Sequence, residues 1–151
     1  MHRMFVILGF SSLLLLGGLS NAAAHCQVPC GIYDDHARVH SMMEDVTTIE
    51  KAVVQIAALA GKHDAQSQNQ MVRWVQTKEE HASKIISLTA EYFLTQKIKE
   101  ASVTDKDYIN RLVTCHRLMR AAMKTKQTVD AKAVKDLRTA VEALGVLYPK
   151  K

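Results

Sequence analysis

Apolar residues recur at alternating steps of three and four along most of the chain after residue 34, a spacing that predicts amphipathic helices. The first stripe begins just after Asp34 and Asp35, either of which suits a helix N-cap, and Gly61 follows it as a stop. Its apolar members are Val39, Met42, Met43, Val46, Ile49, Val53, Ile56 and Ala60. We therefore expect a long helix from about residue 34 to residue 60.

A polar connection over residues 61–69 precedes a second expected helix, from about Gln70 to Lys99. Continuing its helical period places these residues inward: Met71, Trp74, Val75, Ala82, Ile85, Leu88, Tyr92 and Thr95. The same period leaves Ile86 and Phe93 on the outer face, and Val146 is placed outward on the last helix.

Two shorter stripes complete the pattern. The third follows a capping signal at 102–107 and ends near Lys126, and the fourth follows Asp130 as its N-cap. Their inward residues are Tyr108, Leu112, Cys115, Leu118, Met119 and Ala122 in the third, and Val134, Leu137, Val141 and Leu144 in the fourth. Four helices joined by short connections predict an all-α fold, an antiparallel up-down four-helix bundle over residues 34–151.

Composition supports this fold class. The 151 residues are 48% hydrophobic but only 5% aromatic, with 6 Gly and 2 Pro. A β-sandwich or barrel needs more turn residues and β-formers, and a disordered chain would have a smaller apolar fraction. Both classes are therefore excluded.

The first 24 residues have the pattern of a secretory signal peptide. A short basic start with Arg3 precedes an apolar run over 5–19 and the small residues Ala22, Ala23 and Ala24. The alternative, an uncleaved membrane anchor, is disfavoured because the run is shorter than the ~20 residues that a spanning helix needs. We expect cleavage after Ala24, export to the periplasm or the extracellular space, and a mature chain that begins with His25.

The segment between this leader and the first helix, residues 25–33, holds two of the 3 cysteines in the sequence His-Cys-Gln-Val-Pro-Cys-Gly-Ile-Tyr. In a secreted protein, Cys26 and Cys30 could form a disulfide, although it would close a very short loop and add little stability. They could instead bind a metal as thiolates. Cys115 lies on the apolar stripe of the third helix and is expected to be a buried free thiol.

A metal site here would combine sulfur and nitrogen donors. The α-amino group of His25, the amide nitrogen of Cys26 and the Cys26 thiolate would form two fused chelate rings, and Cys30 would complete a square. The His25 imidazole could then reach an axial position. Planar nitrogen and sulfur donors suit Ni(II) or Cu(II), whereas zinc prefers four tetrahedral ligands.

The motif His-Cys-x-x-Pro-Cys-Gly-x-Tyr at a processed amino terminus, followed by a four-helix bundle, resembles the nickel superoxide dismutase family. The resemblance implies dismutation of superoxide to O2 and H2O2 by a nickel ion that alternates between Ni(II) and Ni(III). It also implies that residues 25–33 form a nickel-binding hook, with His25, Cys26 and Cys30 as ligands. Tyr33 would stand over the open axial face and limit access to small anions.

The same resemblance implies a cis peptide bond before Pro29, where such bonds are tolerated, and a homohexamer. In the best-known form of the family, a glutamate and an arginine hold the axial imidazole. By an approximate alignment His40 and His81 take those places here, and Gln27 replaces an aspartate. Because residues behind a ligand set its orientation, His40 and His81 are candidate supporting residues; the alternative is two partly exposed helix histidines.

Charge adds one expectation. The formal net charge is +5, but basic and acidic residues alternate along the helices with no basic run, so we expect no nucleic-acid partner and no membrane binding after cleavage. A positive balance would instead attract an anionic substrate such as superoxide.

Three other functions remain open at this point. The first is an envelope protein that binds or delivers nickel or copper without turnover. The second is a copper oxygenase that uses an amino-terminal histidine, although such enzymes are rich in β-structure. The third is a structural bundle with a small disulfide between Cys26 and Cys30.

Overall fold

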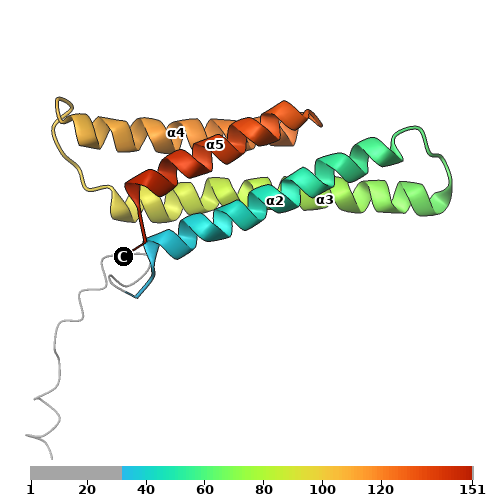
Figure 1. Cartoon of the computed structure of the whole chain (residues 1–151), viewed down its shortest axis with the longest axis horizontal. Helices are drawn as coiled ribbons and strands as arrows, with labels where there is room; N and C mark the ends of the chain where they lie inside the picture. Colours follow the sequence, from blue (N-terminus) through green and yellow to red (C-terminus); the bar gives the residue numbers. More distant parts are fainter. Residues whose placement is uncertain (1–31, 151) are drawn as a thin grey trace, which may run out of the picture.

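The computed structural model describes residues 32–150 and shows only helices within that range. The four α-helices are α2 (Asp35–Leu59), α3 (Ala65–Leu88), α4 (Lys106–Gln127) and α5 (Ala131–Leu147), and a π-helix, η1 (Thr89–Lys97), continues α3. Consecutive helices run in opposite directions (Figure 1). Contacts link α2 to α3, α3 to α4, α4 to α5, and α5 back to α2. The predicted antiparallel up-down bundle is confirmed.

Each α-helix begins at an aspartate. The N-caps are Asp34, Asp64, Asp105 and Asp130, and each carboxylate accepts a hydrogen bond from a backbone amide in the first turn. The Asp34 carboxylate, for example, accepts from the His36 amide at 2.8 Å. Such caps satisfy amides that lack a partner within the helix, and each contributes about 1 kcal/mol. These caps fix where the helices start.

Most of the core consists of the apolar stripes predicted from the sequence, although Ala60, expected inside, is exposed where α2 ends. Its fully buried side chains include Met42, Val46, Ile49, Ala82, Ile85, Cys115, Leu118, Ala122, Leu137, Val141 and Leu144. Cys115 is buried and free, as expected. Within residues 32–150 no helix combines the length and the apolar character needed to cross a membrane.

The second helix begins earlier than predicted. The polar segment over 61–69 was expected to be a connection, but α3 starts at Ala65 with Asp64 as its N-cap. The sequence shows no apolar period there because the first turns of α3 project beyond α4 and α5 and bury few apolar side chains. Only Gly61, at φ 81°, and its immediate neighbours make the turn between α2 and α3.

Two side chains of η1 lie on the opposite face from the one predicted. Phe93 was expected outside and is fully buried, whereas Thr95 was expected inside and is exposed. A π-helix closes i→i+5 hydrogen bonds and so has more residues per turn than an α-helix. The extrapolated α-helical period therefore assigned Phe93 and Thr95 to the wrong faces, although Tyr92 is buried as expected. Val146 is exposed as expected.

The α2–α3 hairpin extends past the ends of α4 and α5 (Figure 1). On this projecting part Val54, Val72 and Val75 are exposed, although Val75 was expected inside. No residue of α4 or α5 reaches that level to cover it. The bundle therefore has four helices at one end and two at the other.

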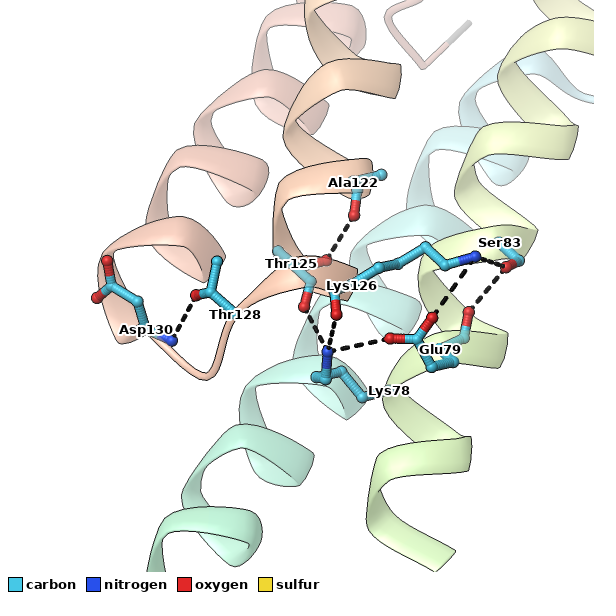
Figure 2. A network of polar contacts seen from close by, with 8 residues as sticks. All are labelled: Lys78, Glu79, Ser83, Ala122, Thr125, Lys126, Thr128 and Asp130. Carbon is cyan, nitrogen blue, oxygen red and sulfur yellow. Dashed lines mark hydrogen bonds and ion pairs between the residues drawn. The ribbon is translucent and has the colours of Figure 1, made fainter. Parts of the chain in front are cut away.

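A buried lysine marks the level at which α4 ends. The Lys78 ammonium donates to the carbonyls of Thr125 at 2.6 Å and Lys126 at 2.7 Å, and to Glu79 at 3.2 Å (Figure 2). Lys126 in turn contacts Ser83 at 2.9 Å. Lys78 thus provides donors for carbonyls in the last turn of α4, where no amide of the same helix follows.

Candidate metal centre

The predicted first ligands lie outside the described residues. This holds for His25, Cys26 and Cys30, and also for Gln27 and the Val28–Pro29 bond. Tyr33 is the one member of the predicted hook site that the structure places. It lies just before α2, at the four-helix end of the bundle.

Tyr33 is surrounded by aromatic and charged groups from two elements. Its ring meets that of Tyr92, on η1, edge to face with centroids 6.5 Å apart. The Arg38 guanidinium lies 5.2 Å from the centre of the Tyr33 ring. The Tyr92 hydroxyl oxygen also lies 3.4 Å from the carbonyl oxygen of Tyr33. Tyr33 itself remains 44% exposed, so its ring has protein on one side and open space on another.

A polar cluster fixes the start of α2 beside Tyr33. The Tyr92 hydroxyl donates to Asp35 Oδ1 at 2.5 Å, and Lys97 Nζ lies 2.9 Å from the same oxygen. Lys97 is also 5.7 Å from the centre of the Tyr92 ring. Burial, together with the hydrogen bond to Asp35, raises the pKa of Tyr92 well above its ordinary value. Tyr92 is therefore a hydrogen-bond donor throughout the neutral range.

A cavity of about 470 Å³ opens at this end of the molecule. Both ends of the described chain line it, since it is bordered by Ile32, Tyr33, Asp34, Asp35, His36, Lys97, Leu147, Tyr148 and Pro149. Burial raises the pKa of Tyr148, partly offset by the neighbouring Arg111. The cavity thus presents aromatic and charged side chains next to the residue that follows the hook.

His81 lies farther along the bundle. Its Nδ1 is 2.5 Å from Asp45 Oδ1, and both side chains are largely buried between α2 and α3. Asp45 follows Asp35 by ten positions, which is about 15 Å along a helix axis. In the single chain, the Asp45–His81 pair therefore lies about three turns from the start of α2.

His40 is a surface residue of α2. Its Nδ1 is 3.7 Å from Glu44, and the two side chains are 70% and 71% exposed. His40 and His81 thus contact different carboxylates, Glu44 and Asp45. Neither contact tests whether they support an axial imidazole, and that role stays a prediction.

Sequence reasoning did not identify Asp35, Arg38 and Lys97 as neighbours of Tyr33. No motif signals them: Arg38 is one of many spaced basic residues, and Lys97 follows Tyr92 by five positions. In an α-helix that spacing puts two side chains about 140° apart. Only the π-helical register brings Tyr92 and Lys97 to one carboxylate.

Three observations bear on whether nickel suits this chain. Among residues 32–150, no three His, Cys, Asp or Glu side chains group as a metal site. Beside the hook, His36 Nδ1 and Arg38 Nε are buried and have no hydrogen-bond partner among the described residues, so this end offers polar groups to an added segment. Residues 25–30 carry an imidazole and two thiols, and such mixed nitrogen and sulfur donors fit nickel or copper.

Comparison with protein families decides between the candidate functions. The family described as nickel-containing superoxide dismutase matches residues 20–151. The chain belongs to the nickel-containing superoxide dismutase family. No curated protein and no solved structure matches the chain. Membership of this family makes the protein a superoxide dismutase, an oxidoreductase whose cofactor is nickel, and the matched range includes the hook, all four helices and the cavity.

Proposed function

We propose that this nickel-containing superoxide dismutase binds its metal through the amino-terminal hook, after removal of residues 1–24. The ligands would be the His25 amine and imidazole, the Cys26 amide nitrogen and thiolate, and the Cys30 thiolate. The observation that carries the proposal is the position of Tyr33, three residues after Cys30, against Tyr92 and at the edge of the cavity. The hook therefore emerges where the bundle already offers a lined space.

When bound, nickel supplies a one-electron redox couple between Ni(II) and Ni(III). The chain's own groups then have distinct tasks. Two thiolates and a deprotonated amide are electron-rich donors, which suits the higher oxidation state. Tyr33, with an aromatic ring that is partly exposed, stands at the entrance and restricts it to small molecules.

Charge around the entrance favours an anionic substrate. The Arg38 guanidinium lies 5.2 Å from the centre of the partly exposed Tyr33 ring. This cation and the positive balance of the mature chain, which is +4 because removal of residues 1–24 takes Arg3 from the +5 of the full sequence, would raise the local concentration of superoxide.

The leader and the assembly complete the proposal. The family match starts at residue 20, so most of the predicted signal peptide lies outside it. The basic start, the apolar run over 5–19 and the small residues Ala22 to Ala24 support export to the periplasm or the extracellular space and a free α-amino group on His25. The homohexamer is inferred from the family resemblance, and the exposed apolar residues Ile32 and Val146, at 70% and 78% exposure, are compatible with an assembly. Light scattering on the mature protein measures the number of subunits directly.

The decisive experiment compares two proteins loaded with nickel, one that begins at His25 and one that keeps Ala24 in front of it. We expect fast superoxide dismutation, measured by pulse radiolysis or stopped flow, only with the free His25 amine. A Cys115→Ser variant serves as the matched thiol control and should keep full activity, since Cys115 is buried in the bundle.

Other outcomes would contradict the proposal in distinct ways. Equal activity with and without Ala24 would exclude the amine as a ligand. Nickel bound without turnover in the mature protein would indicate a binding or delivery protein. No nickel binding, with Cys26 and Cys30 resistant to thiol reagents until reduced, would indicate a disulfide.

A further inference from the structure

The π-helix η1 brings together two side chains that an α-helix would keep apart. Tyr92 and Lys97 are five positions apart, which corresponds to about 140° around an α-helix. In η1 the i→i+5 hydrogen-bond pattern places residues five apart nearly above one another. Both side chains accordingly reach Asp35 Oδ1, Tyr92 at 2.5 Å and Lys97 at 2.9 Å.

The resulting cluster is more enclosed than the ion pairs between residues four apart on one helix. The side chains of Lys97 and Asp35 are 28% and 22% exposed, whereas those of the Lys132–Asp136 pair on α5 are 74% and 55% exposed. Exposed pairs contribute little because water screens them. An ion pair that also accepts a tyrosine hydroxyl constrains geometry more strongly.

The cluster is connected to Tyr33 through Tyr92. The Tyr92 hydroxyl, held by Asp35, is also 3.4 Å from the Tyr33 carbonyl, and the two rings meet edge to face. The Lys97 ammonium also lies over the Tyr92 ring, 5.7 Å from the ring centre. A change at Lys97 is therefore transmitted by two contacts to the backbone and the ring of Tyr33.

We propose that Asp35 and Lys97 are positioning residues that lock Tyr92 in place and thereby set the position of Tyr33 at the base of the hook. Lys97 acts through this contact chain rather than by attracting superoxide, because Asp35 already compensates its charge. The proposal concerns the bundle side of the site. Its consequence for catalysis rests on the proposed hook.

The test uses Lys97→Met in the metal-free protein, because methionine keeps an unbranched side chain of nearly the same length but removes the charge. Tyrosine carries a ring label for NMR, and Tyr33→Phe assigns the Tyr33 signal among the 4 tyrosines. We expect Lys97→Met to shift the Tyr33 signal, Lys97→Arg to restore it, and the control Lys132→Met to leave it unchanged. Circular dichroism confirms that each variant keeps its helices.

Activity of the nickel-loaded proteins gives the second readout. We expect Lys97→Met to lower kcat/KM about tenfold, and to lower it equally at low salt and at about 1 M salt, where charges beyond about 3 Å are screened. The Tyr92→Phe/Lys97→Met double variant should lose no more than the worse single variant, because both changes break one cluster.

Two results would overturn the inference. If the Tyr33 signal does not move in Lys97→Met, the cluster does not position Tyr33. If the activity deficit disappears at high salt, Lys97 attracts the anionic substrate and does not position Tyr33. Failure of the hook proposal is a separate outcome: the wild-type protein would then bind no nickel, while the NMR comparison would still decide the role of Lys97.

Discussion

Lys78 carries an ammonium group into the interior of the bundle, where only 3% of its surface remains exposed. A buried charge is costly unless its donors are satisfied. Here two carbonyls from the last turn of α4 and one carboxylate accept all three donors (Figure 2). The Lys78 ammonium therefore provides hydrogen-bond donors for the last carbonyls of α4, and these carbonyls provide acceptors for the buried charge.

Lys78→Met should lower the free energy of unfolding by about 1–3 kcal/mol, because the carbonyls of Thr125 and Lys126 lose a donor without gaining water. Urea unfolding followed by the fluorescence of Trp74, the one tryptophan, measures this loss. The control is Lys84→Met on the same helix, where the Lys84–Glu80 pair is exposed and should contribute less than about 0.5 kcal/mol. Equal losses in the two variants would contradict the role given to Lys78.

Cys115 gives a pH-dependent prediction. Burial raises the pKa of its thiol from 9.0 to about 11. As the pH rises, the thiol therefore loses its proton in the unfolded chain before it does so in the folded chain. The contribution of Cys115 to the free energy of unfolding is thus complete below pH 9 and is lost as the pH rises toward about 11. The stability advantage of the wild type over Cys115→Ala should narrow across that interval in urea titrations, whereas parallel stability curves would show that the thiol is not shielded. Cys26 and Cys30 are common to both proteins and cancel.

At the scale of elements, the two glycines in and between the helices should respond oppositely to alanine. Gly61 has φ 81°, a conformation that costs a residue with a Cβ about 1–2 kcal/mol. Gly145 lies inside α5, where a Cβ would meet Val39 at 3.4 Å, an ordinary contact, and alanine favours the helix by up to about 1 kcal/mol. Urea midpoints should fall for Gly61→Ala and rise for Gly145→Ala; a shift in the same direction would refute this.

The helices could be predicted from the sequence because each carries its own pattern of caps and apolar residues. Asp130 was identified as a helix start in this way, Asp34 as one of two candidates, and Asp105 lies within the capping signal at 102–107. Asp64 was missed because the first turns of α3 bury little. The faces of Phe93 and Thr95 were wrong because no local signal marks the change from α-helix to π-helix. Pattern reading therefore succeeds where one period holds along an element.

Part of the candidate site could likewise be predicted from the sequence, and part of it could not. The hook motif is contiguous, so its residues could be named from the sequence and the family match now includes them. The neighbours of Tyr33 could not be named, because Lys97 depends on the register of η1 and the cavity wall depends on where the end of α5 packs. Long-range packing, rather than composition, decides which side chains surround the first described residues.

At the scale of the whole molecule, the bundle is asymmetric along its length. The start of α2, helix η1 and the end of α5 meet at one end, with the cavity among them, and the α2–α3 hairpin projects at the other (Figure 1). The chemistry is proposed for the first end, where residues from distant parts of the chain converge. The projecting hairpin provides exposed valines but no residue of that cluster.

This arrangement decides where an affinity tag can be attached. An extension at the amino terminus would block the proposed His25 amine, and an extension at the carboxyl terminus would start beside Leu147, Tyr148 and Pro149, which form the cavity wall. Neither end of the chain is therefore neutral for labelling or immobilisation. The exposed turn after Gly61, at the far end of the hairpin, is the place where an inserted peptide leaves the entrance clear.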